Sequence, residues 1–376
     1  MSCCRAVRRA ADWTSGLSAV LSRVKAQTKC LRGPEAAPSL CRSQATISGE
    51  KPRRRAIDLA RKIQQERVKP RAPVSAQQRR VTELKRFSLQ LQQVHPNVLA
   101  KHLHRSVLHQ DRDLVVVNKP YGVPVRDDPR VTSISSVLPV LSKMMDEMKI
   151  KSDSQLFPCL GLEKETTGVL LLARSEASVE HIVSLHRSNQ VQRKYWVITV
   201  GVPVPSEGVI DIPVIQREVS GPRPHYKMAL SPLFRMNDAG DGLTKVRAHQ
   251  QAHPAVTKYR VLDSSNGCSL VELQPLTGEK HQMRVHMAFA LACPILGDHK
   301  YSHWNKLAPQ KLPERVLGRL GLEQSKIRYL PLHLHARQVT VSGASHGDID
   351  VSCPLPKYFT QTLKWLYLNP PDEKDK

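Results

Sequence analysis

The 376-residue chain has few acidic side chains, no long hydrophobic run and no paired C-x-x-C cysteines. Its purely apolar stretches, such as residues 169–173, are far shorter than the ~20 residues that a membrane-spanning helix requires. Hydrophobic residues make up 40% of the chain and charged residues 24%, which excludes wholesale disorder. The sequence therefore predicts a protein that mostly folds and has no membrane partner.

The spacing of the cysteines and histidines does not suit a metal site. The eight cysteines lack the C-x-x-C pairs of a structural zinc site, and those in the body of the chain lie in mostly apolar contexts that suit buried free thiols. His281 and His286 are five residues apart, off the i,i+4 spacing, and His333-x-His335 has no visible third ligand. We therefore predict no metal site and no disulfide framework.

The charge is strongly positive and unevenly distributed. Lys and Arg exceed Asp and Glu by 57 − 33 = +24, and residues 1–100 account for 21 − 6 = +15 of this excess. A basic protein favours a polyanionic partner such as RNA, because neutralising phosphates releases counterions. A basic targeting segment raises the same number without any nucleic acid. The surplus of +9 in the remaining 276 residues is the fairer indication of an RNA partner.

The N-terminal part reads as targeting and linker sequence. Residues 1–40 are rich in Arg, Ser and Ala and contain no compact apolar segment, which is typical of a mitochondrial transit peptide and indicates the mitochondrial matrix. A disordered basic tail is the alternative. Residues 41–74, rich in Pro, Arg, Lys and Gln, are expected to be a disordered basic linker, and residues 369–376 a disordered tail.

The body of the chain alternates between helical and strand patterns. Val81, Leu84 and Phe87 recur at helical spacing among basic residues, and Pro96 stops this pattern. We therefore expect residues 75–106 to be a basic amphipathic helical lead-in to the domain. Residues 107–368 form the expected folded domain of the α+β class around a central sheet. Its expected strands lie at 114–118, 168–173, 195–200 and 269–273. Helices are expected around 179–186 and at 281–291, and a polar insertion at 215–258.

Three short blocks place reactive side chains at the ends of expected strands. They are residues 118–120, 162–168 and 277–286. In the third block Thr277 is expected to cap a helix that presents His281 and Arg284 on one cationic face, able to hold a carboxylate or a phosphate. Taken singly, a solvated turn, a charged loop and a surface helix face explain the three blocks equally well.

Taken together, the blocks resemble a known family. Residues 113–125, 162–174, 194–214 and 273–301 resemble, in order and spacing, the motifs of RluA-type RNA pseudouridine synthases over roughly residues 107–340. The basic N-terminus makes the vertebrate mitochondrial members the nearest resemblance. The resemblance implies a pseudouridine synthase catalytic domain at 107–368, with a central mixed, mostly antiparallel sheet flanked by helices. It also implies a cofactor-free isomerisation of uridine to pseudouridine in RNA.

The resemblance also implies site residues. Glu163 stands at the position of the catalytic acid, Tyr195 corresponds to the residue that packs against the target base, and Arg284 to the arginine that pairs with the catalytic carboxylate. Lys119 corresponds to a residue that supports the edge of the site. The expected RNA-binding residues are Lys119, Lys164, Lys194, Lys280 and His281.

One block departs from the family pattern. Where the family has His-Arg-Leu-Asp-Lys, this chain has Leu160-Gly161-Leu162-Glu163-Lys164, so the acid is longer by one methylene and the preceding His and Arg are absent. A shift of about 1 Å in a catalytic group can cost ~10²-fold in rate. Three explanations stay open: a slower catalytic acid, a relic in a protein that only binds RNA, or a local sequence error.

The expected substrate is structured RNA, either mitochondrial rRNA or tRNA, with mitoribosome assembly factors as further partners. The rival hypothesis is a catalytically silent RNA-binding or ribosome-assembly factor on the same fold. A third is a basic RNA chaperone whose activity lies in residues 50–95.

Overall fold

The computed structural model describes most of the chain from residue 75 onward. The described residues are 57, 61, 75–91, 94–126, 131–146, 155–219, 224–232, 234–236, 243–245, 249–343 and 347–371. The expected transit peptide at 1–40, nearly all of the expected linker at 41–74 and residues 372–376 lie outside this set. Residues 71–376 belong to one compact unit. Within the described part, none of the helices combines the length and the apolar character needed to span a bilayer.

The helical lead-in forms two helices instead of one. Ser75 caps the first through a reciprocal pair of hydrogen bonds with Gln78, and the helix ends at Leu89. Pro96 opens the second, because proline at a first-turn position lacks only an N–H that has no helical partner there. The helices are α2 (Ala76–Leu89), α3 (Pro96–Arg105), α4 (Ile134–Asp146), α5 (Glu176–Arg187), α6 (Gln282–Val285), α7 (Glu314–Leu320) and α8 (Lys357–Leu366), with a π-helix at His286–Ala290 and a 3₁₀ helix at Gln324–Tyr329.

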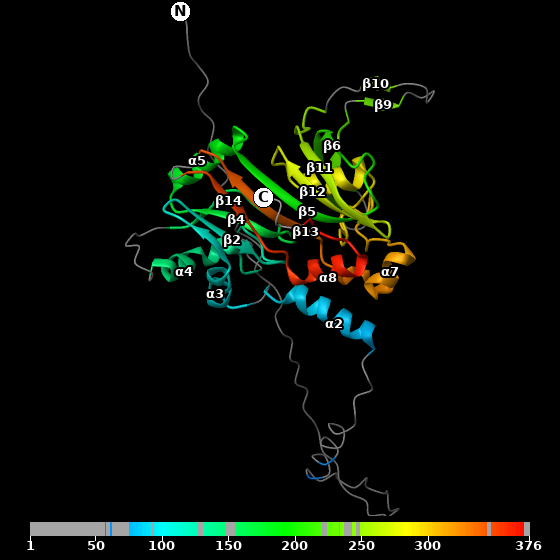
Figure 1. The fold of residues 1–376 in the computed structure, drawn as a ribbon, viewed down its shortest axis with the longest axis horizontal. Helices are drawn as coiled ribbons and strands as arrows, with labels where there is room; N and C mark the ends of the chain where they lie inside the picture. Colours follow the sequence, from blue (N-terminus) through cyan, green and yellow to red (C-terminus); the bar gives the residue numbers. More distant parts are fainter. Residues whose placement is uncertain are drawn as a thin grey trace, which may run out of the picture. The chain divides into compact units, whose positions relative to one another are not determined.

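A ten-stranded sheet runs through the compact unit in the order β1-β2-β4-β13-β5-β12-β11-β6, with β3 and β14 paired to β4 and β13 (Figure 1). Its strands are β1 (Val107–Gln110), β2 (Leu114–Lys119), β3 (Phe157–Pro158), β4 (Thr167–Ala173), β5 (Val191–Val200), β6 (Glu207–Asp211), β11 (Val256–Ser265), β12 (Cys268–Pro275), β13 (Leu334–Val341) and β14 (Ile349–Ser352). Strands β4 and β13 pair in parallel, whereas the other described pairs are antiparallel. The expected α+β fold with a mixed, mostly antiparallel sheet is confirmed.

The expected insertion at 215–258 supplies two small sheets outside the main one. Strands β7 (Val214–Val219) and β8 (His225–Leu230) form one hairpin, and β9 (Phe234–Met236) pairs with β10 (Leu243–Lys245) in another. The β7–β8 hairpin is attached to the body, because the buried ammonium of Lys227 donates hydrogen bonds to the carbonyls of His303 and Lys306 at 2.8 and 2.9 Å.

The two faces of the sheet carry different structures. Alternate residues of each strand point to opposite faces, so Tyr195 and Val197 enter one apolar core while Trp196 and Ile198 enter another. Helix α5 packs into the first core. Helices α2, α7 and α8 pack into the second, and α3 and α4 cover the neighbouring strands β2 and β4 on that side (Figure 1). The helices therefore leave much of the first face available for a site.

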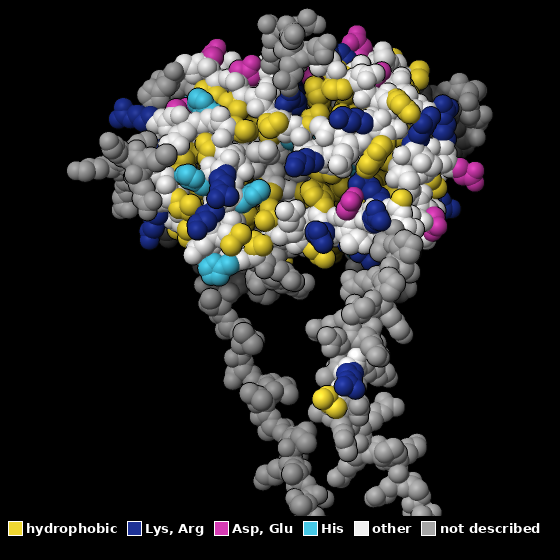
Figure 2. Space-filling model, turned by 60° about the horizontal axis from the view of Figure 1, so that its bottom comes forward, with side chains coloured by type: hydrophobic (Ala, Val, Ile, Leu, Met, Phe, Trp, Pro, Cys, Tyr) yellow, Lys and Arg dark blue, Asp and Glu magenta, His cyan; other side chains and the backbone are white. Residues whose placement is uncertain are grey.

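The helix-covered side is basic. Lys and Arg side chains are spread among hydrophobic ones across it, while most Asp and Glu lie toward its rim (Figure 2). Helix α3 contributes exposed Lys101 and Arg105, and α2 contributes exposed Arg79, Lys85 and Arg86. The expectation of a basic amphipathic lead-in is thus met by two helices whose apolar faces belong to the folded unit.

Gly168 allows the parallel pair β4–β13 to form. Its φ is +107°, and a Cβ atom there would lie 2.2 Å from the carbonyl oxygen of Ala336 on β13. Glycine alone adopts this conformation without cost and leaves room for the neighbouring backbone. Because the loop carrying Glu163 runs directly into β4, this close approach helps to fix the position of that loop.

We predict that Gly168→Ala lowers the free energy of unfolding by about 3 kcal/mol, from backbone strain and steric overlap together. The matched control is Gly318→Ala at an exposed position of α7, where nothing lies within 4 Å of the added atom. This change should be neutral or stabilising by up to about 1 kcal/mol. Urea unfolding followed by circular dichroism measures both. Equal effects in the two variants would contradict this account of Gly168.

Candidate active site

The segment after β12 is built differently from the expected capped helix. Thr277 does not cap it: its hydroxyl accepts a hydrogen bond from the Val256 N–H and donates one to Gln282 Oε1. The residue before the helix is His281, which has a left-handed φ of +55°. Arg284 is 4% exposed, so the expected cationic face is buried and holds carboxylates. The turn directs both basic side chains into the protein, where they meet the loop before β4.

Arg284 is the centre of the buried polar cluster. Its Nε and one terminal nitrogen each donate a 2.8 Å hydrogen bond to the carboxylate of Asp298, a bidentate contact. Its other terminal nitrogen donates to Glu163 Oε2 at 2.6 Å and lies 3.6 Å from a carboxylate oxygen of Glu165. The predicted pairing of Arg284 with Glu163 is therefore present in the structure.

Three carboxylates share this one guanidinium, and the pKa values of two of them, Glu163 and Asp298, shift in opposite directions. Burial opposes the charged form of Arg284, but the neighbouring carboxylates raise its pKa well above the usual value. Burial would raise the pKa of Asp298, yet the bond to Arg284 and two backbone N–H donors lower it below the usual value. For Glu163 burial prevails over the attraction of Arg284, helped by the charges of Asp298 and Glu165, and its pKa is raised.

His281 connects Glu163 to a second hydrogen-bond chain. The Met228 N–H donates to the hydroxyl of Tyr301, which lies 2.5 Å from His281 Nδ1. Burial and the nearby Arg284 lower the pKa of His281 to about 3, so the imidazole is neutral. We assign the ring proton to Nε2, because this tautomer lets the Tyr301 hydroxyl donate to Nδ1; Nε2 lies 3.8 Å from Glu163 Oε2. His281 therefore directs an N–H toward the carboxylate.

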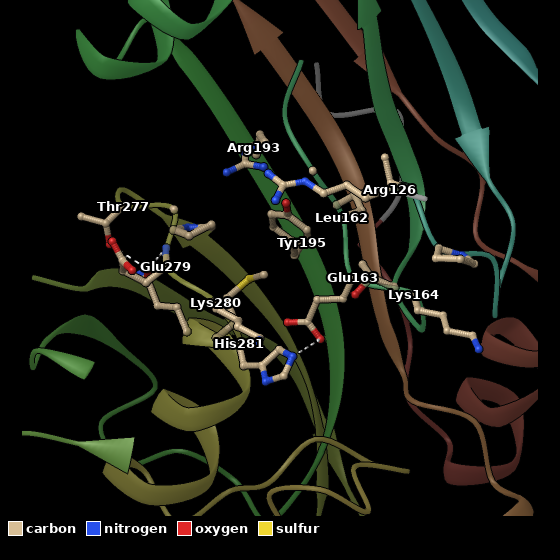
Figure 3. Close-up of a pocket in the computed structure, with 18 residues that line it drawn as sticks. Arg126, Leu162, Glu163, Lys164, Arg193, Tyr195, Thr277, Glu279, Lys280 and His281 are labelled. Carbon is tan, nitrogen blue, oxygen red and sulfur yellow. Dashed lines mark hydrogen bonds and ion pairs between the residues drawn. The ribbon is translucent and has the colours of Figure 1, made fainter. Parts of the chain in front are cut away.

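A cavity of about 590 Å³ opens in front of Glu163, within the range of about 300–1,000 Å³ typical of small-ligand sites. Tyr195 and Arg193 line it together, because they are two residues apart on β5 and point to the same face. Arg126 reaches toward Arg193 above Tyr195, while Glu163 and His281 lie below (Figure 3). The Nε of Arg193 is buried and has no hydrogen-bond partner among the described residues.

The predicted RNA-binding lysines take different positions. Lys164 and Lys280 line the cavity. Lys194 does not, because it alternates with Tyr195 along β5 and shares the opposite face of the sheet with Trp196. Lys119 is fully buried, so its ammonium is not available to a phosphate.

Lys119 instead holds the loop that carries Glu163. Its Nζ donates hydrogen bonds to the carbonyls of Pro120, Lys164 and Thr166 at 3.1, 2.9 and 2.8 Å. Burial lowers its pKa to about 7. The arrangement agrees with support for the edge of the site, the role that the family resemblance implied.

Sequence reasoning missed Asp298, Tyr301, Arg126 and Arg193. Asp298 and Tyr301 lie inside the block 273–301, but a turn and a loop separate them from Arg284 along the chain. Only the fold places them beside it. A signal for Arg193 was present: it precedes Tyr195 by two residues in a strand, and such residues share a face. No group of three or more His, Cys, Asp or Glu side chains in the described regions is arranged to hold a metal.

Comparison with known proteins identifies the family. A model described as RNA pseudouridylate synthase matches residues 113–289, and the mitochondrial pseudouridylate synthase RPUSD4 of Danio rerio is 59% identical over 86% of this chain and 92% of its own length. The chain belongs to the RNA pseudouridylate synthase family. The human RPUSD4 synthase is 51% identical over 84% of this chain and 83% of its own length. A solved structure of the human protein has 49% identity and a TM-score of 0.65, covering 74% of this chain and 98% of that one.

As a pseudouridylate synthase, the protein needs a group that acts beside the ribose and a space for one nucleoside. Glu163 presents a carboxylate at the cavity wall, where Arg284 lies 2.6 Å and His281 Nε2 lies 3.8 Å from one of its oxygens. Tyr195 supplies an aromatic side chain on an adjoining wall.

We predict that Glu165→Gln lowers the pKa of Glu163, because removing a neighbouring negative charge favours ionisation. A titration of ¹³C-labelled glutamate carboxyls by NMR measures the shift. The matched control is Glu279→Gln, since Glu279 lines the same cavity but does not form an ion pair with Arg284. An unchanged pKa in the Glu165 variant, or an equal shift in the control, would show that the two carboxylates do not compete for one guanidinium.

Proposed function

We propose that this protein isomerises uridine to pseudouridine in structured mitochondrial RNA, either rRNA or tRNA, in the mitochondrial matrix, with Glu163 as the catalytic carboxylate. The observation that carries this proposal is the 2.6 Å pair between Glu163 and Arg284 at the wall of a cavity lined by Tyr195. The mitochondrial setting draws on the names of the relatives in fish and human and on the basic N-terminus.

The reaction is internally balanced. The bond between ribose C1′ and base N1 breaks, the base rotates, C1′ bonds to C5, the proton on C5 leaves and N1 gains a proton. No oxidant or reductant is consumed. Positive charge develops at the ribose as the glycosidic bond breaks, and a fixed carboxylate stabilises that charge. Glu163 acts as the anion, so its raised pKa requires a pH above that value for full activity.

The carboxylate of Glu163 lies at the cavity wall, although its side chain is one methylene longer than the aspartate of the family pattern. Its side chain is 25% exposed. Arg284, which donates two hydrogen bonds to Asp298, fixes the position of one carboxylate oxygen of Glu163. The other oxygen is not needed for that ion pair and is available to a substrate. A relic position in a protein that only binds RNA has no need for such a restrained carboxylate.

The target uridine must leave the RNA stack to enter the cavity, at a cost of a few kcal/mol. The family places an arginine where this chain has Gly161, and there it helps to occupy the space that the flipped nucleotide vacates. Arg193 and Arg126 line the same cavity as Gly161 and supply the missing positive charge from β5 and from the loop after β2. We therefore assign to Arg193 the RNA contact that Gly161 cannot make.

We predict that Glu163→Gln lowers the single-turnover rate at least ~10²-fold, because the amide carries no charge to stabilise the ribose. Glu163→Asp, which restores the family acid, is expected to raise the rate. Release of the C5 proton from tritiated RNA transcripts measures both. Glu279→Gln serves as a control at the rim of the same cavity. If wild type modifies no mitochondrial RNA but binds it normally, the silent RNA-binding factor replaces the proposed enzyme.

We predict that Arg193→Ala lowers kcat/KM about 10- to 100-fold through the loss of a charge-assisted phosphate contact. Gly161→Arg in the same chain should restore much of this loss, because nothing lies within 4 Å of a Cβ atom added at position 161. The control is Gly161→Ala with Arg193→Ala, which fills the position without adding a charge. Equal activity of the two double variants would exclude the exchange of roles between positions 161 and 193.

A further inference from the structure

A second cavity of about 480 Å³ lies on the other side of the central ion pair. Glu163 lines the first cavity and Arg284 lines the second, and the two side chains are joined by their 2.6 Å bond. Glu165 also lines the second cavity, next to Arg284. The two spaces are therefore separated by little more than one pair of side chains, so a group adjacent to the target nucleoside can reach the second one.

The lining of this cavity combines aromatic surface with positive charge. Tyr226, on β8, is 58% exposed, and Leu307 opposite the β7–β8 hairpin is 57% exposed. Lys300 and the exposed Arg328 add two cations to the same lining. A base stacks on an exposed aromatic ring, and a phosphate binds a cation, so the combination matches one nucleotide.

The inner end of the cavity favours a base over a free phosphate. Glu165 places a carboxylate there, which repels a phosphate but accepts hydrogen bonds from the N–H groups of a base edge. The guanidinium of Arg284 beside it is already committed to carboxylates. The phosphate of the bound nucleotide is therefore expected near Lys300 and Arg328.

Much of this cavity lies outside the segment that the family model matches. That segment ends at residue 289, whereas Lys300, Leu307 and Arg328 follow it in the chain. Tyr121 continues the lining toward the helical side, since its ring packs against Phe87 of α2 with centroids 5.1 Å apart. Tyr121 thus lies between this cavity and α2.

We propose that the second cavity binds a nucleotide that flanks the target uridine in the RNA strand, its base against Tyr226 and its phosphate at Arg328 and Lys300. This inference rests on the proposed function, because it takes the first cavity as the site of the target. Specificity for the sequence around the target then arises from residues outside the common family segment.

The test measures binding of a fluorescein-labelled single-stranded oligouridylate to the full chain by anisotropy at several salt concentrations. Tyr226→Ala should weaken binding about tenfold, the effect of losing one stacked base, and leave the salt dependence unchanged. Arg328→Ala should weaken binding and reduce the slope of log K against log salt by about 0.7, the value for one phosphate of a single strand. Circular dichroism verifies that each variant is folded.

Matched controls come from the pair Arg319 and Tyr367 on α7 and at the end of α8. Tyr367 is 57% exposed and Arg319 lies over its ring at 4.6 Å, but neither lines the cavity. Arg319→Ala and Tyr367→Ala should leave both affinity and salt slope unchanged. Losses in the control variants equal to those in the cavity variants, or no loss in the cavity variants, would overturn the inference.

A crosslinking experiment locates the flanking nucleotide directly. Transcripts that carry 5-iodouridine next to a target uridine should crosslink on irradiation to the peptide containing Tyr226, and Tyr226→Ala should remove that product. Crosslinks confined to other peptides would contradict the placement. Because binding and crosslinking do not require turnover, failure of the proposed isomerisation is recognised separately, as bound RNA without pseudouridine.

Discussion

The arrangement of the site depends on one guanidinium shared between carboxylates. Arg284 is almost completely buried, and a buried cation is stable only when it is paired and its donors are satisfied. Asp298 satisfies two of those donors with a bidentate contact, which leaves the remaining nitrogen free to hold Glu163 at 2.6 Å. Asp298 thus stabilises the arginine, and the arginine positions the reactive carboxylate. Burial raises the pKa of Glu163, whereas Arg284 and two backbone N–H donors keep the pKa of the buried Asp298 below its usual value.

Much of the fold could be predicted from the sequence because its signals are local. Runs of buried residues such as 114–118 and 168–173 indicate strands wherever they lie, and α2 was visible from its apolar spacing. The second helix, α3, was not, because Pro96 ends one helical pattern and opens another with the same residue. The order of strands in the sheet also depends on contacts that no local pattern encodes.

The site was predictable in part for the same reason. Glu163, Tyr195 and Arg284 were found because they lie in recognisable motifs, and they do come together. Lys194 was misassigned because charge alone was considered, while the alternation of β5 turns it away from Tyr195. The role of Thr277 was mistaken because the left-handed conformation of His281 shifts the start of the helix. Asp298 required the tertiary structure, since nothing near it in the sequence identifies its partner.

The position of β13 in the sheet has a consequence for the assembly of the site. This strand is formed by Leu334–Val341, near the end of the chain, yet it lies between β4 and β5 and is the described strand that joins them. Glu163 precedes β4 and Tyr195 belongs to β5, so the two halves of the reaction centre become neighbours only when the late strand is inserted. A chain that lacks this strand would carry both halves with unpaired strand edges. The site therefore cannot assemble before residues 334–341 have been added to the chain.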